Sequence, residues 1–396
     1  MKKGWQTKTL GEICDIERGG SPRPIQEFIT TDPNGINWIK IGDATASGKY
    51  IYKTEEKIKP EGVKRSRMVY EGDFILSNSM SFGRPYIMKT TGCIHDGWLV
   101  LHQPKVDPDY LYHALSSDLV FDQFDRLAAG STVRNLNIGL AKSVEIPYPP
   151  LAEQQRIVGL LDEAFEGLAT AKANAEKNLQ NARALFESHL QSVFTQRGSG
   201  WVEKRLVEVS REFGRGKSKH RPRNEPKLYD GPYPFIQTGD ISNADHWLTD
   251  YTQTYSELGL AQSRLWPKGT ICIAIVGATV GETAILDFES CFPDSVIGIV
   301  VNEEWADNEY VEFLLQSFKA LLKEKGKGTA RDNINLGTFE NQLFPFPTLK
   351  KQKAIVATLN SLREETQRLA RLYERKHAAL EALKRSLLHQ AFTGKL

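Results

Sequence analysis

Cysteine is scarce in this chain, and its four cysteines, Cys14, Cys93, Cys272 and Cys291, are far apart. They form no CxxC pair, and no histidine lies at metal-ligand spacing, so neither a zinc site nor a redox motif is indicated. We expect four small buried apolar residues and no metal. The chain also lacks an apolar run of about 18 residues, and no hydrophobic segment follows the two lysines of its N-terminal MKKGWQTKTL. We therefore predict a cytoplasmic protein without a signal peptide.

Motifs for DNA chemistry are missing as well. A methyltransferase needs a glycine-rich cofactor loop and an Asn/Asp-Pro-Pro-aromatic tetrapeptide that stacks the flipped base, but PYPP at 147–150 has the wrong order. VGATVG at 276–281 lacks the Lys and Ser/Thr of a phosphate loop. EEK at 55–57 has no upstream carboxylate for a nuclease site, and HD at 95–96 recurs only as PD at 293–294. We predict no catalytic residue and no enzyme activity.

Overall charge is also nearly balanced, with a formal net charge of +2. This total gives no sign of a strongly basic nucleic-acid binder. By segment, however, the net charge is +1 for 1–150, −2 for 151–195, −4 for 196–348 and +7 for 349–396. Local clusters of charge are therefore more informative about nucleic-acid binding than the total charge is.

What the sequence does contain is a duplication at a displacement of about 197 residues. A period this long indicates two copies of a domain and not a solenoid. The ordered matches include Arg18-Gly19 with Arg215-Gly216, Gly42-Asp43 with Gly239-Asp240, Cys93 and Asp96 with Cys291 and Asp294, and Pro147, Pro149, Leu151 and Gln154 with Pro345, Pro347, Leu349 and Gln352.

Each copy divides into a globular part and a tail without proline. The predicted segments are a first domain at 1–150, a long helix at 151–198, a second domain at 199–348 and a second long helix at 349–396. Short β-rich runs such as 37–42, 73–77, 93–101 and 270–277, with helices expected at 109–127 and 307–325, predict mixed α/β (α+β) domains. Their strand order does not follow from the sequence.

The tails carry apolar or small residues at alternating spacings of four and three, which is typical of a seam between two helices. A 45-residue helix would be about 65 Å long. The predicted seam residues are Ile157, Leu161, Leu168, Leu185, Ile355, Leu359, Leu362, Leu369, Leu380, Leu383 and Leu387.

A basic Gly/Ser-containing loop recurs in both copies and is the first candidate for DNA contact. In the second copy, REFGRGKSKHRPR at 211–223 contains one acid, Glu212. Such a loop can donate to phosphates and present arginine to guanine edges, although a solvated surface loop is the alternative. The candidate residues are Arg18, Ser21 and Arg23 in the first copy and Arg215, Lys217, Lys219, Arg221 and Arg223 in the second.

A second recurring pattern is GSTVRNLN at 130–137 with GTARDNIN at 328–335. Arg and Asn are suited to bidentate reading of G and A, and a turn with a purely structural role is the equal alternative. Its candidates are Thr132, Arg134, Asn137, Thr329, Arg331 and Asn335. A third and weaker candidate is Arg84, at the end of the loop 77–85.

The repeat and one signature together resemble the specificity subunits of type I restriction-modification systems. The signature is PPLAEQQRIV at 149–158, and the second copy, PTLKKQKAIV at 347–356, departs from it at positions that include Thr348, Lys350 and Lys351. The resemblance implies two target-recognition domains held apart by an antiparallel coiled coil with pseudo-two-fold symmetry. Each domain would bind half of a split, asymmetric target in double-stranded DNA.

The resemblance also implies which molecules this chain would assemble with. Methyltransferase subunits, two in number, would carry S-adenosylmethionine, and restriction subunits, where the system has them, would use ATP and Mg²⁺. This chain itself would bind no cofactor. Two alternatives remain open: a stand-alone two-headed DNA-binding regulator, and a methyltransferase whose cofactor site is not recognised.

Overall fold

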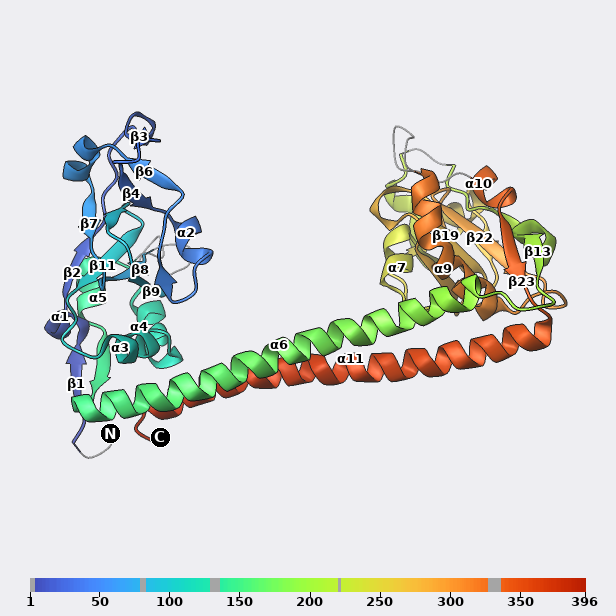
Figure 1. Cartoon of the computed structure of the whole chain (residues 1–396). Helices are drawn as coiled ribbons and strands as arrows, with labels where there is room; N and C mark the ends of the chain where they lie inside the picture. The colour runs from blue at the N-terminus through green and yellow to red at the C-terminus, as the bar shows by residue number, and fades with distance from the viewer. Residues whose placement is uncertain (1–3, 79–82, 129–135, 220–221, 327–335) are drawn as a thin grey trace. The chain divides into compact units, whose positions relative to one another are not determined.

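The computed structural model describes residues 4–78, 83–128, 136–219, 222–326 and 336–396. The chain forms two compact units: unit 1 comprises Met1–Glu176 with Glu374–Leu396, and unit 2 comprises Lys177–Tyr373. Each unit contains a globular domain and parts of two long helices, α6 (Leu151–Thr195) and α11 (Leu349–Phe392) (Figure 1). The predicted fold class, two repeated mixed α/β domains with two long packed helices, is confirmed.

The described part of the unit 1 domain has two five-stranded sheets and a two-stranded ribbon. The first sheet has the order β2 (Asp15–Arg18), β11 (Trp98–His102), β8 (Phe74–Ser77), β9 (Pro85–Met88), β5 (Tyr50–Ile51). The second has the order β3 (Ile29–Thr30), β6 (Glu56–Ile58), β4 (Ile36–Ile39), β10 (Gly92–Ile94), β7 (Arg67–Val69). The ribbon is β1 (Gln6–Thr9) with β12 (Glu145–Tyr148), and the short helices are α1 (Leu10–Ile13), α2 (Ile41–Thr45), α3 (Pro108–Leu115), α4 (Asp118–Ala128) and α5 (Ile138–Lys142).

Unit 2 repeats this plan with small changes. Its five-stranded sheet has the order β14 (Ser210–Arg215), β22 (Val296–Val301), β19 (Ile271–Ala274), β20 (Thr283–Leu286), β16 (Trp247–Leu248). In the described residues the other sheet has four strands: β17 (Gln253–Tyr255), β15 (Tyr229–Phe235), β21 (Ser290–Cys291), β18 (Leu265–Trp266). The ribbon is β13 (Val202–Arg205) with β23 (Leu343–Phe346), and the helices are α7 (Thr238–Asn243), α8 (Glu257–Ala261), α9 (Asn308–Gly326) and α10 (Leu336–Glu340).

The predicted elements mostly appear, with two subdivisions. The run 93–101 forms two strands, β10 and β11, because a turn closed by the Trp98 N–H bond to the His95 carbonyl separates them. The segment 109–127 forms α3 and α4, since the Ser117 carbonyl accepts the amides of Val120 and Phe121 and starts a second helix. All four cysteines are buried, as expected. None of the helices in the described ranges combines the length and apolar composition needed to cross a bilayer.

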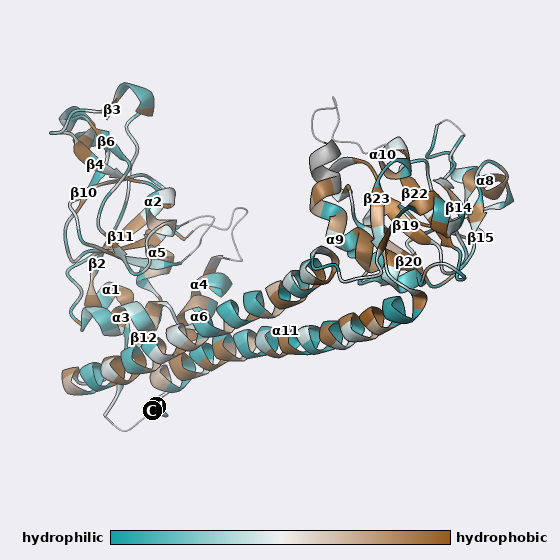
Figure 2. Cartoon of the chain, turned by 45° about the vertical axis from the view of Figure 1, so that its right-hand side comes forward, coloured by the Kyte–Doolittle hydropathy of each residue, from teal (hydrophilic) through white to brown (hydrophobic). Residues whose placement is uncertain are grey.

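The long helices pack in opposite directions. In unit 1 the first half of α6 meets the last part of α11, where Lys172 Nζ donates to Glu381 Oε1 at 2.8 Å. In unit 2 the last part of α6 and the first part of α11 share one apolar core, through Leu190 and Leu359 among others. Polar and apolar residues alternate along both helices (Figure 2), as a packed helix pair requires.

The predicted seam residues differ in how far they are buried. Ile157, Leu161 and Leu359 are buried, and six further residues are partly buried: Leu168, Ile355, Leu362, Leu369, Leu380 and Leu387. Leu185 and Leu383 are 51% and 47% exposed, so their assignment to the seam was wrong. An α-helix has 3.6 residues per turn, so its buried face drifts away from a strict seven-residue repeat. Ala182, Leu190 and Phe194 are the buried residues on that stretch of α6.

A buried glutamine attaches each long helix to its domain. Gln154, on the first turn of α6, accepts the Asp107 backbone N–H at 2.9 Å and donates to the Pro149 carbonyl at 2.8 Å. Gln352, on the first turn of α11, accepts the Asp307 N–H at 2.8 Å and donates to the Pro347 carbonyl at 2.9 Å. Both glutamines are almost fully buried. The Gln of the signature is thus a fixed joint between domain and helix.

A charged contact near this joint is also duplicated, with different chemistry. In unit 1, Lys49 forms an ion pair with Asp109. The equivalent of Lys49 in unit 2 is His246, because its carbonyl accepts the Ile285 N–H as that of Lys49 accepts the Ile87 N–H.

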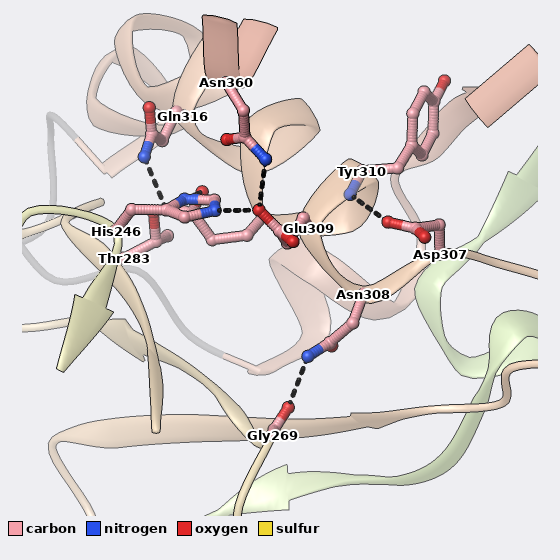
Figure 3. A network of polar contacts seen from close by, with 10 residues as sticks. His246, Gly269, Thr283, Asp307, Asn308, Glu309, Tyr310, Gln316 and Asn360 are labelled. Atoms are coloured by element: carbon pink, nitrogen blue, oxygen red, sulfur yellow. Dashed lines mark hydrogen bonds and ion pairs between the residues drawn. The ribbon is translucent and has the colours of Figure 1, made fainter. Parts of the chain in front are cut away.

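In unit 2 this histidine lies between two carboxylates. The His246 ring nitrogens contact Glu312 at 2.5 Å and Glu309 at 3.0 Å. Asn360 of α11 donates to Glu309 at 2.8 Å, so the network joins the domain to the helix (Figure 3). Burial lowers the pKa of His246, but its bonds to Glu309 and Glu312 outweigh burial and raise that pKa above its usual value, against opposition from Arg363.

Unit 1 contains a buried histidine of opposite behaviour. His113 on α3 contacts Asp162 of α6 at 2.9 Å, and its ring lies edge-on to Phe165 at 5.4 Å. Burial lowers the pKa of His113 below its usual value, although Asp162 and Asp109 act against this change. The two domain-helix contacts therefore respond to pH with opposite signs.

We expect the two histidines to give opposite pH-dependent effects on stability. The folded pKa of His246 is raised, so its contribution is complete below about pH 6.5 and is lost as pH rises through the folded pKa. The difference in melting temperature between the chain and a His246→Asn variant should thus be larger at about pH 6 than at about pH 8. Asn is chosen because it tolerates the positive φ of 84° at this position.

The His113→Asn variant is the matched control. The folded pKa of His113 is lowered, so its contribution is complete above about pH 6.5 and is lost as pH falls through the folded pKa. Its melting-temperature difference should therefore be larger at about pH 8 than at about pH 6. Calorimetric scans at both pH values measure the two differences. Differences independent of pH would contradict the assigned protonation states.

Candidate nucleic-acid interface

The basic loop of each copy is attached to the sheets at the same backbone positions. The Gly19 N–H donates to the Trp98 carbonyl at 2.9 Å, and the Gly216 N–H donates to the Val296 carbonyl at 2.9 Å. A Cβ at Gly19 would lie 2.0 Å from a backbone oxygen, and one at Gly216 would lie 2.2 Å from another. Only glycine fits there, which explains why this glycine recurs in both copies.

An aspartate holds the far end of each loop. In unit 1, Asp96 accepts the Ser21 hydroxyl at 2.6 Å and the Arg23 guanidinium at 3.3 Å. In unit 2, Asp294 accepts two bonds from Arg223, at 2.7 and 3.0 Å. The Ser21 hydroxyl is the main cause that lowers the pKa of Asp96. Asp96 and Asp294 had no assigned role in the sequence, although their recurrence at matching positions was visible there.

These arginines remain accessible despite their partners. The Arg23 side chain is 78% exposed and the Arg223 side chain 48%. An ion pair this exposed contributes at most about 1 kcal/mol, and it occupies only one or two of the five donors of a guanidinium. The aspartates therefore orient the arginines at little cost to their availability for an anionic ligand.

The remaining basic residues of the loop fall into three groups. Arg215, Lys217 and Lys219 are exposed, and no carboxylate among the described residues lies at salt-bridge distance. Arg18 donates from Nε to the Asp96 carbonyl at 3.1 Å. Arg221 lies outside the described residues.

In unit 1 the loop borders a cavity of about 930 Å³. Ser21 and Arg23 line one side of it, and Trp38, Lys40 and His95 also belong to its wall. Burial lowers the pKa of His95, which keeps the ring neutral near pH 7. Cations, a neutral imidazole and an indole thus face one space, a combination suited to phosphate and base contacts.

The second sequence pattern is only partly described. Thr132, Arg134, Thr329, Arg331 and Asn335 lie outside the described residues. Asn137 caps helix α5, because its side-chain oxygen accepts the Leu140 N–H at 2.9 Å. This is the structural role that the sequence left open for that residue.

Arg84 lies apart from the basic loop. Its guanidinium is 5.3 Å from the centre of the Tyr86 ring. It lines a different cavity, of about 580 Å³, whose wall includes Phe165 of α6 and Lys384 of α11. The structure therefore groups Arg84 with the domain-helix contact of unit 1 and not with the other DNA candidates.

A comparison with known protein families matches both copies of the repeat. The family model of the type I restriction modification DNA specificity domain matches residues 2–179 and again residues 198–374. The chain belongs to this family. It is a DNA specificity subunit of a type I restriction-modification system.

The subunit has relatives that align with nearly its whole length. It is 24% identical to the putative type I restriction enzyme MjaX specificity subunit of Methanocaldococcus jannaschii, over 100% of this chain and 94% of that protein. It is 23% identical to the type I restriction enzyme EcoBI specificity subunit of Escherichia coli, over 99% and 86%.

Two solved structures share the fold of this specificity subunit. A chain from a study of complex assembly and conformational transition in the type I R-M system matches with a TM-score of 0.83 and 20% identity, covering 100% of this chain and 99% of that one. The HsdS subunit of Thermoanaerobacter tengcongensis matches with a TM-score of 0.64 and 20% identity, covering 100% and 98%.

Proposed function

We propose that each domain of this specificity subunit reads one half of a bipartite, asymmetric DNA target through its basic loop. The observation that supports this most is the pair of equivalent loops. Gly19 and Gly216 attach them to the same backbone positions, and Asp96 and Asp294 hold them, while their remaining side chains differ. A constant scaffold with variable tips is what two readers of different sequences require.

We further propose that the subunit performs no chemistry itself. In this proposal methyltransferase subunits bring S-adenosylmethionine, and restriction subunits bring ATP and Mg²⁺ in a system that has them. The catalytic motifs missing from the sequence support this division, as do relatives named as specificity subunits of restriction enzymes. Labelled S-adenosylmethionine should therefore transfer no methyl group to DNA with the isolated chain, and transfer should require the methyltransferase subunits.

The division of labour between the domains is tested by exchanging one of them. Residues 1–150 are replaced by the corresponding domain of a relative, and the chain is expressed with its methyltransferase subunits. We expect the methylated motif to change in one half only, because the second domain and its basic loop are untouched. Methylation-sensitive sequencing of cellular DNA reads both halves at once.

The reciprocal exchange of residues 199–348 is the control and should change the other half. If either exchange altered both halves, the two domains would not read separately. A chain that binds its target tightly without any partner subunit would instead support a stand-alone regulator.

A further inference from the structure

A second duplicated polar site is organised by one aspartate in each copy, and in unit 1 it lines the same cavity as the basic loop. In unit 1, Asp43 accepts the Lys40 N–H at 2.8 Å and the Glu55 N–H at 2.9 Å. In unit 2, the equivalent Asp240 accepts the Gln237 N–H at 2.7 Å and the Thr252 hydroxyl at 3.1 Å. The aspartate thus connects the same two segments in both copies.

Each site presents one pair of hydrogen-bonded side chains. Lys40 Nζ donates to Glu56 Oε1 at 2.7 Å in unit 1, and Gln237 Nε2 donates to Gln253 Oε1 at 2.6 Å in unit 2. The pairs are equivalent, because Trp38 lies opposite Glu56 in strand register as Phe235 lies opposite Gln253.

The chemistry of the pair therefore differs while its support stays the same. The side chains of Lys40 and Glu56 are 35% and 39% exposed, and Gln237 and Gln253 are both exposed. Pairs this accessible contribute little to stability. Folding accordingly does not require a charged pair in one copy and an amide pair in the other.

A glycine near each pair is unexplained by the fold. Gly42 and Gly239 are exposed, neither has a positive φ, and a Cβ at either position would meet no atom within 4 Å. Both lie in the short helices α2 and α7, where glycine is less favourable than alanine. A glycine with neither strain nor crowding to explain it is consistent with close approach by another molecule. Gly42 and Lys40 line the same cavity as Arg23 and His95.

We propose that these two pairs are base-reading side chains of the specificity subunit. Lysine donates to the O6 and N7 acceptors of guanine, and glutamate accepts from the cytosine amino group. Lys40 and Glu56 thus read a G·C pair in the half-site of the first domain. Glutamine pairs with the N6 and N7 edge of adenine, so Gln237 and Gln253 read an A·T pair in the other half-site. This inference rests on the proposed function, in which the basic loops contact DNA.

The first test converts one pair into the other. A Lys40→Gln/Glu56→Gln variant should fold normally, since unit 2 already accommodates a glutamine pair on this scaffold. Assembled with its methyltransferase subunits, it should lose about 10- to 100-fold preference for G·C at one position of one half-site and gain preference for A·T there. Sequencing methylated sites from a randomised DNA library measures the preference at every position.

A matched control removes the same two charges elsewhere in the domain. Lys89 and Glu71 form an exposed ion pair at 3.9 Å that does not line the cavity. The Lys89→Gln/Glu71→Gln variant should retain the original motif. An unchanged motif in the Lys40→Gln/Glu56→Gln variant, or equal changes in both variants, would overturn the inference.

The second test concerns the glycines. Gly42→Ala and Gly239→Ala should leave the melting temperature unchanged or slightly higher, because nothing in the protein surrounds the added methyl group. Each should weaken binding of the assembled complex to its target about 10-fold or more, by holding DNA away from the pair. Full affinity in both variants would overturn the inference.

Failure of this inference is distinguishable from failure of the proposed function. If alanine variants of the basic loop weaken DNA binding while the glutamine and glycine variants change nothing, the proposed function stands and the base-reading pairs are rejected. If the loop variants also leave binding unchanged, both proposals fall.

Discussion

Replacing Arg215, Lys217, Lys219 and Arg223 together by alanine should reduce DNA binding of the assembled complex about a thousandfold near physiological salt. Each cation that neutralises a phosphate releases counterions and adds about 0.9 to the slope of log affinity against log salt concentration. Loss of four such contacts should therefore lower the slope by up to about 4. Binding to the DNA sequence that the complex methylates, measured at several salt concentrations, gives both the affinity and the slope.

Two control variants test whether removal of any charge in unit 2 changes DNA binding, or only removal of the loop cations. Lys268→Ala removes an exposed cation of unit 2 that pairs with Asp287, and it should leave affinity and slope nearly unchanged. Asp294→Asn removes the negative charge that competes with DNA for Arg223 but keeps an oxygen acceptor that can orient it, so binding should be retained or strengthened. If affinity and slope were unchanged in the four-residue variant, the loop would be a solvated surface segment that does not contact DNA.

Replacing Gln154 by leucine should destabilise unit 1 by about 1–3 kcal/mol or more. The substitution leaves the buried Pro149 carbonyl without its partner, which costs about this amount, and loss of the bond to the partly buried Asp107 N–H adds a smaller cost. Gln352→Leu should have the same effect on unit 2, through Asp307 and Pro347. Denaturant unfolding measures the loss, and hydrogen exchange should report reduced protection of the Asp107 or Asp307 amide in the corresponding variant.

Gln155→Leu provides the matched control, since Gln155 is the exposed neighbour of Gln154 on the same helix turn. Its effect should stay within about 0.5 kcal/mol. Equal effects of Gln154→Leu and Gln155→Leu would show that the buried amide does not join the domain to α6. The glutamine of the signature would then need another explanation, such as a contact with a partner subunit.

Much of the fold could be predicted because its signals are local. The tails without proline and the four-and-three spacing are properties of neighbouring residues, and the duplication is visible when the chain is compared with itself. Together they indicated two mixed α/β domains and two long helices. The exposed positions of Leu185 and Leu383 show the limit of that approach. A heptad pattern assumes a constant buried face, whereas the face of a straight helix drifts and follows the domain that packs on it.

The candidate site was less accessible to sequence reasoning. The basic loops were recognisable by composition, but their aspartate partners were not, because Arg23 and Asp96 are 73 residues apart in the sequence. The pairs Lys40 with Glu56 and Gln237 with Gln253 were missed for a different reason. They are polar residues without a motif, and they become a pattern only when the strand registers of the two copies are compared.

By itself, the sequence determined that the molecule is a duplicated protein whose helices begin at equivalent proline-marked positions. The helix starts can be predicted from proline positions and periodicity because they depend on contacts within a few turns of chain, and the duplication is visible when the chain is compared with itself. Only the tertiary structure decided which side chains lie together: Arg23 with Asp96, Lys40 with Glu56, and His246 between Glu309 and Glu312. Pairing of distant strands and packing of α9 on the sheet create these neighbours, and no local pattern specifies such long-range contacts.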